Sequence, residues 1–322
     1  MHSIASPLLW IVFGVVVVAA LAVDLLMMRN LGPHKVALRE ALLWSAAWIA
    51  LALLFNFGLW WYLDARIDPA IAHEAALAFL TGYLMEKALA VDNIFVFLMV
   101  FAHFAVPPVQ QQRVLIYGII GAIVLRGILI FVGAVLIQQF HWILYVFGAF
   151  LVLTGIKMLR GNDSTPDLDQ NPMVAWISRH LPITSGYRKS HFMVHEDGKW
   201  WFTPLFVVVV MIGITDVIFA VDSIPAIFAI TDDPFLVLSS NVFAVLGLRA
   251  LFFVLAGMVG RFHLLAYGLA GVLIFIGIKM LIADFWHIPV AAALGVVALA
   301  IGASMLASVL LPTRKGERNG SS

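Results

Sequence analysis

The sequence predicts an all-α, polytopic membrane protein of about nine transmembrane helices with an inverted three-helix repeat. Composition is the first observation: 63% of the 322 residues are hydrophobic and only 11% are charged, whereas soluble domains carry roughly 25% charged residues. The second is that apolar runs of about 20 residues recur along the chain, and runs of this length cross a bilayer. The third is a motif that occurs twice.

The apolar runs predict a single membrane domain over residues 1–322. The expected spans are 7–28, 41–62, 75–101, 113–137, 141–159, 203–230, 234–258, 264–283 and 288–311. Turn-forming pairs such as Gly32-Pro33 and Pro107-Pro108 separate several of them. No basic segment typical of a signal peptide precedes the first run, so we expect it to be a retained span.

Lys and Arg are distributed unevenly among the predicted loops. Of the 19 residues of these two types, thirteen fall in the odd-numbered loops and the C-terminal tail, and Arg66 is the one member in the even-numbered loops. Cytoplasmic loops carry the excess of Lys and Arg. We therefore expect the N-terminus outside, segment 160–202 as a cytoplasmic loop, and the C-terminus in the cytoplasm.

Three sequence matches define the repeat. Ala90-Val91-Asp92-Asn93-Ile94 reappears as Ala220-Val221-Asp222-Ser223-Ile224, Leu125-Arg126 as Leu248-Arg249, and Gly155-Ile156-Lys157-Met158 as Gly277-Ile278-Lys279-Met280. The offsets are 130, 123 and 122 residues, so the order is kept. Each repeat contains three spans, over 75–159 and 203–284, and an odd number of spans inverts the second copy. Inverted repeats are typical of secondary transporters, with substrate sites near the midplane; the alternative is a duplicated scaffold without transport.

Four acids lie inside the predicted spans, with Glu86 and Asp216 each six residues ahead of Asp92 and Asp222. A charged carboxylate at the bilayer centre costs on the order of 3 kcal/mol or more unless it is paired or hydrated. Hard divalent cations prefer such oxygen ligands. The four acids therefore predict an ion path, with additional neutral oxygens from Asn93 and Ser223.

The alternative to an ion path is that the four acids form buried ion pairs with Arg126, Arg249, Lys157 and Lys279. These basic residues could also neutralise the acids of an ion path while no cation is bound. Asp24 and Asp284 lie near span ends, where we expect them to face headgroups or to cap helices.

Helix geometry separates the two acids of each repeat. Residues six apart differ by about 9 Å in rise, so each acid pair cannot share one tight site on an unbroken helix. Pro225 makes a break available in the sixth span, because it leaves the Val221 carbonyl without its helical donor. We expect Asp92 and Asp222 to meet near the midplane, and Glu86 and Asp216 to form a second station or a gate.

The motifs resemble those of the TerC family of integral membrane proteins, in its Alx-like branch. The resemblance rests on Glu86-x5-Asp92-Asn93 and on Asp216-x5-Asp222-Ser223-Ile224-Pro225, and it extends over nearly the whole chain. It implies manganese export across the bacterial inner membrane, with Mn²⁺ as transported substrate and protons as a candidate counter-ion. This branch is expected to carry Glu-x-x-Asp ahead of the second motif, whereas this chain has Gly213 at the Glu position.

Other functional classes find less support in the residues. The chain has no Cys, and no phosphate-binding glycine loop, HExxH motif or nucleophile elbow occurs, so we expect no enzyme, no organic cofactor and no nucleic-acid partner. The second hypothesis is a metal- or pH-responsive membrane scaffold that aids metallation of exported proteins or tellurite resistance. Its docking segment would be the loop 160–202.

Overall fold

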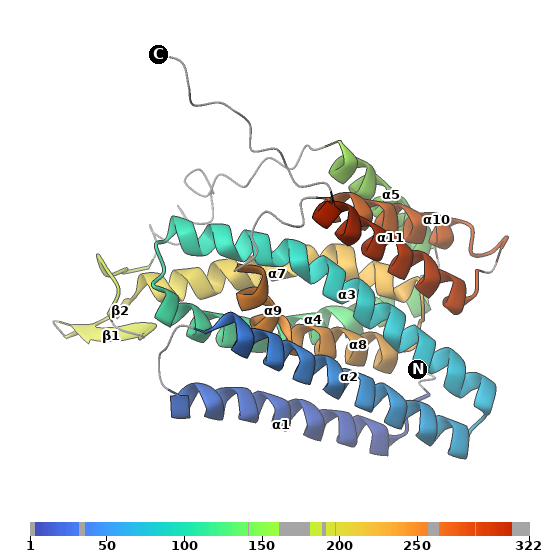
Figure 1. Ribbon diagram of the computed structural model, residues 1–322, viewed down its shortest axis with the longest axis horizontal. Helices are drawn as coiled ribbons and strands as arrows, with labels where there is room; N and C mark the ends of the chain where they lie inside the picture. Colours follow the sequence, from blue (N-terminus) through green and yellow to red (C-terminus); the bar gives the residue numbers. More distant parts are fainter. Residues whose placement is uncertain are drawn as a thin grey trace, which may run out of the picture.

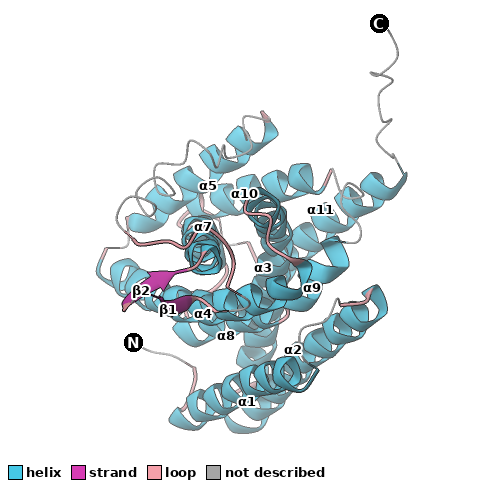
Figure 2. Ribbon diagram, turned by 90° about the vertical axis from the view of Figure 1, so that its left-hand side faces the viewer, coloured by secondary structure: helices cyan, strands magenta, loops and turns pink. Residues whose placement is uncertain are grey.

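The computed structural model describes residues 4–31, 36–140, 142–160, 181–188, 191–196, 198–256, 264–286 and 288–310. The helices are α1 (Pro7–Leu31), α2 (Leu38–Arg66), α3 (Pro69–His103), α4 (Pro108–Gln139), α5 (Ile143–Leu159), α7 (Pro204–Phe228), α8 (Pro234–Leu246), α9 (Leu248–Ala256), α10 (Leu265–Leu281) and α11 (Val290–Leu310). A small hairpin of β1 (Met193–Glu196) and β2 (Lys199–Phe202) precedes α7. The helices form three layers: α1 with α2, then α3, α4, α7, α8 and α9, then α5, α10 and α11 (Figures 1 and 2).

The predicted all-α class is confirmed, and each predicted span coincides with a helix or, once, with two. By length and composition, five of the described helices could cross a membrane, or six if the bent pair α8 and α9 counts as one span. Helices α5 and α10 are apolar but shorter. The number of nine spans therefore stays a prediction.

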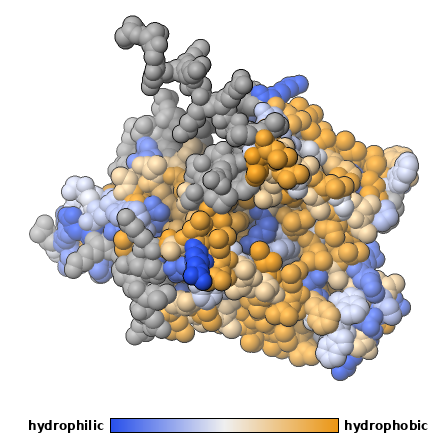
Figure 3. Space-filling view, viewed as in Figure 1, coloured by the Kyte–Doolittle hydropathy of each residue, from blue (hydrophilic) through white to orange (hydrophobic). Residues whose placement is uncertain are grey.

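The outer surface is largely apolar along the helices and polar at the two ends of the molecule (Figure 3). On α1, Ile11, Val15 and Val18 each expose more than 60% of their surface, and on α2 Leu54 and Trp61 do the same. Exposing apolar side chains of this size to water is unfavourable, whereas lipid tails are as apolar as these side chains and solvate them well. The exposed apolar belt matches a bilayer environment.

Proline and aspartate define several helix starts. Pro is the first residue of α3, α4, α7 and α8, where its missing N–H removes no helical hydrogen bond. The Asp68 carboxylate accepts from Ala70 N at 2.7 Å and caps α3, and Asp233 accepts from Phe235 N at 2.8 Å and caps α8. Asp233 also accepts from Ile4 N at 2.6 Å, so the N-terminal segment lies at the same end of the molecule as the α7–α8 turn.

The chain breaks between α8 and α9, where the two helix axes differ by 43°. A Cβ atom on Gly247 would lie 2.6 Å from Lys87 Nζ and 3.1 Å from Trp48 Cβ, so a larger residue there would require these two side chains to shift. The break that Pro225 made available is not found, because α7 continues through Pro225 to Phe228. The interruption in the second repeat is therefore in its second span rather than its first.

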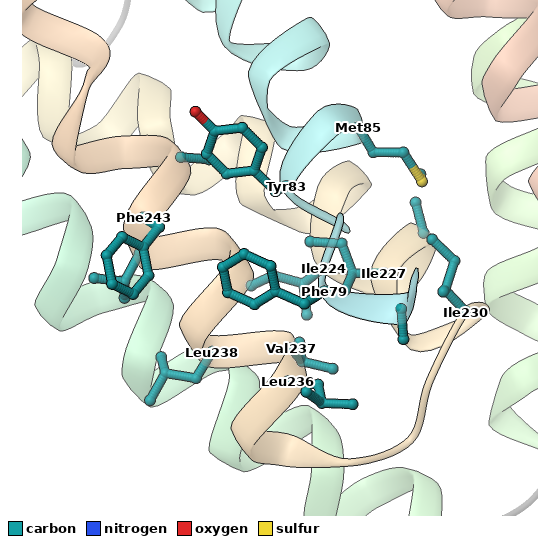
Figure 4. Packing of buried hydrophobic residues seen from close by; sticks show 14 of the residues in the cluster. Phe79, Tyr83, Met85, Ile224, Ile227, Ile230, Leu236, Val237, Leu238 and Phe243 are labelled. Carbon is teal, nitrogen blue, oxygen red and sulfur yellow. The ribbon is translucent and has the colours of Figure 1, made fainter. Parts of the chain in front are cut away.

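The middle layer is held together by an apolar cluster between α3, α7 and α8 (Figure 4). Phe79, Ile227 and Phe243 are almost completely buried in it. Gly82 allows α3 to approach α8, since a Cβ there would lie 2.7 Å from Ser240 Oγ. Close packing of these helices determines which polar residues meet in the interior.

Helices α5 and α10 contact each other through glycines at equivalent positions. A Cβ on Gly155 would lie 2.8 Å from the Ala270 carbonyl oxygen and 2.6 Å from an Ile274 side-chain carbon. A Cβ on Gly277 would lie 2.6 Å from the Gly148 carbonyl oxygen and 2.7 Å from a Val152 side-chain carbon. With the offset of 122 residues, Gly155 corresponds to Gly277, Ile274 to Val152, and Ala270 to Gly148. The contact of Gly155 with Ala270 and Ile274 is therefore repeated, at equivalent positions, by the contact of Gly277 with Gly148 and Val152.

The described part of segment 160–202 consists mainly of the hairpin and the residues before it. Arg188 Nε donates to Glu196 Oε1 at 2.7 Å across exposed surface. The Tyr187 hydroxyl donates to the Phe104 carbonyl at 2.6 Å, which joins this segment to the end of α3, and partial burial raises the pKa of Tyr187. Residues 161–180 lie outside the described residues.

Candidate functional site

Arg126 of α4 lies between two acids that come from the two predicted repeats. Its Nε and Nη2 atoms donate to Asp216 Oδ2 and Oδ1 of α7, at 2.9 and 2.8 Å. Its Nη1 atom donates to Glu86 Oε1 of α3. All three side chains are at most 2% exposed. Glu86 and Asp216 therefore face one another across a single guanidinium.

Asn241 of α8 completes this group, and we refer to Glu86, Arg126, Asp216 and Asn241 as the Arg126 network. Asn241 Nδ2 donates to Glu86 Oε2 at 3.1 Å, and Asn241 Oδ1 accepts from Arg126 Nη1 at 3.2 Å. The side chain is fully buried. The network joins four helices and carries two negative charges and one positive charge.

The structure thus shows ion pairing for two of the predicted acids, Glu86 and Asp216, and the partner is one of the predicted basic residues. Sequence reasoning missed Asn241, although it follows Ser239 and Ser240 in an otherwise apolar span. A run of three polar residues at membrane depth is a signal that could have identified it.

Asp92 and Asp222 lie on α3 and α7, but their side chains are outside the described residues. The two helices run in opposite directions, as Figure 1 shows. Each Asp lies six residues beyond its acid in the Arg126 network, which is about 9 Å along the helix axis. The backbone positions of Asp92 and Asp222 are therefore on opposite sides of the network, Asp92 toward the hairpin and Asp222 toward the α7–α8 turn.

The neutral oxygens predicted as ligands are buried. Asn93 and Ser223 are 2% and 1% exposed, and Ser223 Oγ has no hydrogen-bond partner in the described part of the chain. A buried hydroxyl without a partner costs about 1–3 kcal/mol, so this oxygen has unused capacity to bind a ligand. Gly213, at the position where the family branch is expected to carry Glu, has open space in the direction of a Cβ.

A second buried ion pair joins α1 to α9. Arg249 Nη2 donates to Asp24 Oδ1 at 2.5 Å, and both residues are less than 10% exposed. The expectation that Asp24 faces headgroups is therefore wrong: α1 packs beside α8, and Asp24 reaches inward. Arg249, the repeat counterpart of Arg126, does not contact the Arg126 network in the described structure.

Two lysines donate to backbone carbonyls rather than to acids. Lys87 Nζ donates to the Ala244 carbonyl at 2.8 Å and Lys279 Nζ to the Ala229 carbonyl at 3.0 Å. Both carbonyls lie in the last turn of a helix or just after it, where the normal helical donors are absent. These bonds stabilise the ends of α7 and α8.

A cavity of about 550 Å³ opens at the end of the molecule where α7 turns into α8. Its lining includes Glu74, Asp232, Asp233 and Asp284 together with Lys279. Acids outnumber bases in this cavity, so it favours cations over anions. It lies beyond Asp222 along the direction of α7.

Within the described residues, no group of three or more His, Asp or Glu side chains is placed to hold a metal ion. Glu86 and Asp216 are joined by Arg126 instead, and the side chains of Asp92 and Asp222 lie outside the described residues. Any cation site made from Glu86 and Asp216 would require Arg126 to move.

The chain matches the model of the TerC family of integral membrane proteins over residues 71–316, from α3 to the C-terminal tail. It is 54% identical over 297 residues to an Escherichia coli (strain K12) protein named "Putative membrane-bound redox modulator Alx", with 92% of each chain covered. A protein of the same name from Photorhabdus laumondii is 49% identical over 319 residues, with 99% of this chain and 100% of the relative covered. No solved structure matches the chain. The protein belongs to the TerC family of integral membrane proteins.

Proposed function

We propose that the protein exports a divalent metal ion across the bacterial inner membrane, with manganese as the favoured substrate and protons as the counter-ion. The observation that carries this proposal is the meeting of Glu86 and Asp216, from two antiparallel helices, in the buried interior. Buried carboxylates in a membrane domain mark ion paths by default. The oxygen-rich surroundings suit a hard cation rather than a soft one.

The arrangement of the helices supports a transporter with an inverted repeat. Helices α3 and α7 carry the two copies of the motif and run in opposite directions. The matched glycine contacts of α5 and α10 are those expected around a pseudo-two-fold axis between them. Inverted repeats place substrate sites between the two halves, which is where the Arg126 network lies.

The positions of the acids suggest a path with successive stations. In order along the helix axes it would run through Asp92, the Arg126 network and Asp222, and then into the acidic cavity at the α7–α8 end. In this order Asp92 and Asp222 belong to different stations and not to one shared site, because their backbone positions lie on opposite sides of the Arg126 network. Ser223, with its unpartnered hydroxyl, would supply an oxygen beside Asp222.

The name of the relatives suggests a second candidate role in redox balance. This chain has no cysteine, so such a role would not run through a thiol of its own. A change in metal supply to redox enzymes would produce a redox effect indirectly. The two candidates therefore share one testable step, the movement of metal.

Metal flux in proteoliposomes tests the proposal. We expect the full-length protein to move Mn²⁺ into vesicles that contain a Mn²⁺-sensitive dye, and Asp92→Asn or Asp222→Asn to abolish this flux with normal folding and insertion. Arg188→Gln, which removes only an exposed ion pair of the hairpin, is the matched control and should transport normally. Normal flux from both Asp variants would show that these acids are not on the path.

A further inference from the structure

The Arg126 guanidinium occupies the place where a cation bound by Glu86 and Asp216 would lie. We propose that Arg126 is a built-in counter-cation that alternates with the transported cation, and that Glu86, Asp216 and Asn241 form the cation site when Arg126 leaves. This inference rests on the proposed function of cation transport. It assigns Asn241 as a ligand and Arg126 as a positioning residue.

All four carboxylate oxygens of the Arg126 network are already hydrogen bonded. Three of them accept from Arg126, and Glu86 Oε2 accepts from Asn241 at 3.1 Å. A cation that reaches the network would therefore be repelled by the positive charge of the guanidinium and would find no carboxylate oxygen without a hydrogen bond. Cation binding at this site requires that Arg126 be displaced.

Charge balance explains why an arginine is suited to this place. Two buried carboxylates close together repel each other unless a cation lies between them. Arg keeps its charge at every physiological pH, and its planar fork binds Asp216 through two hydrogen bonds. The empty protein can thus keep both acids ionised in the membrane without a metal ion.

The same displacement exposes a set of oxygen ligands. Asn241 Oδ1 now accepts from Arg126 at 3.2 Å, and this lone pair becomes available when the guanidinium leaves. Together with Glu86 and Asp216 it forms a hard-oxygen set from three helices. Divalent Mn²⁺, Mg²⁺ and Ca²⁺ all prefer ligands of this type.

The surrounding space links displacement to a change of conformation. The small cavity beside Asp216, lined also by Phe97, Gly118 and Leu248, measures about 10 Å³. This is room for one water molecule at most and not for a guanidinium group. Arg126 therefore cannot move into this cavity, and we expect α4 to shift against α7 when Arg126 leaves the acids, which would couple cation binding to helix movement.

Binding of Mn²⁺ to the purified full-length protein, followed by the loss of the free Mn²⁺ EPR signal, tests the proposal. Arg126→Gln should bind Mn²⁺ at least about tenfold more tightly than the unaltered protein, because a competing positive charge is gone. Flux through this variant should fall, since nothing displaces the cation from the acids. A purely structural arginine predicts no gain in binding.

Further variants decide the interpretation. Glu86→Gln/Arg126→Gln/Asp216→Asn should lose the gain in affinity, and Arg188→Gln should bind as the unaltered protein does. If Arg126→Gln does not fold, Arg126→Met takes its place, because it also removes the positive charge but keeps an unbranched side chain, and it should bind Mn²⁺ more tightly for the same reason. Unchanged affinity in the folded Arg126 variant, or an equal gain in the triple variant, would overturn the proposal. The binding result stands even if the unaltered protein transports no Mn²⁺, an outcome that would instead reject the proposed function.

Discussion

Asp24 is the sole carboxylate in the described structure that contacts Arg249, and both groups are buried between α1 and α9. We predict that Asp24→Asn destabilises the folded protein by about 3–5 kcal/mol, because Arg249 then keeps a buried charge without a counter-charge. The measurement is thermal unfolding of the purified protein in detergent. Asp24→Asn/Arg249→Gln removes both charges and should recover most of the loss. Equal melting temperatures for the single variant and the unaltered protein would contradict this prediction.

Single residues show clearly what the sequence can and cannot tell. The acids at Glu86 and Asp216 were identified because a carboxylate in an apolar run is rare and costly. The identity of their partner remained open, because Arg126 and Arg249 occupy equivalent positions and only helix packing decides between them. Asp24 was misinterpreted for the same reason: its depth follows from its position in α1, but the direction of its side chain follows from the neighbour of α1.

At the scale of elements, the α5–α10 contact depends on glycine. We predict that Gly277→Ala destabilises the protein by about 1–3 kcal/mol, since its Cβ would lie 2.6 Å from the Gly148 carbonyl oxygen and the helices would have to separate. Gly271→Ala, on the same helix, has open space in that direction and should be tolerated or slightly stabilising. Unfolding of both variants in detergent compares them directly. Equal stability of the two would show that the helices can separate at no cost.

The β1–β2 hairpin should respond to acid through one ion pair. The hydrogen bond from Arg188, with its charge, lowers the pKa of Glu196 below the ordinary value of 4.5. A carboxyl whose pKa is lowered in the folded state stabilises that state above the ordinary value, and the contribution is lost as the pH falls through the lowered pKa. NMR titration of the Glu196 carboxyl should give a midpoint below 4.5, and Arg188→Gln should return it to the ordinary range. An identical midpoint in both proteins would show that the pair does not persist in solution.

Element boundaries were largely predictable, and element interruptions were not. Each expected span overlaps a helix, or two helices in the case of 234–258, because apolar length and the Pro or Gly residues that end helices are local properties of the sequence. The break lies at Gly247, whose close neighbours Lys87 and Trp48 lie far away in sequence and approach it only in the folded state. Pro225 removes one hydrogen-bond donor, but the helix α7 tolerates this loss and continues for three residues.

At the scale of the whole molecule, orientation is still a prediction from the distribution of Lys and Arg. The hairpin with Arg188 and Lys199 lies at one end, and the N-terminal segment and the acidic cavity lie at the other. We predict that a reporter fused after Ser322 is active in the cytoplasm and that one fused before the N-terminus is active outside. A signal from outside the cell at Ser322 would reject either the orientation or the number of nine spans.

The matched contacts of Gly155 and Gly277 have a consequence for a shorter protein. A contact in which each residue meets the counterpart of its own partner is self-complementary, as in a symmetric dimer. A chain made only of residues 69–159, inserted in both orientations across a bilayer, would present the α5 surface to a second copy of itself with Gly148 and Gly155 in reciprocal contact. The glycine contacts of α5 and α10 are therefore compatible with an ancestor that contained a single three-helix repeat and formed an antiparallel dimer.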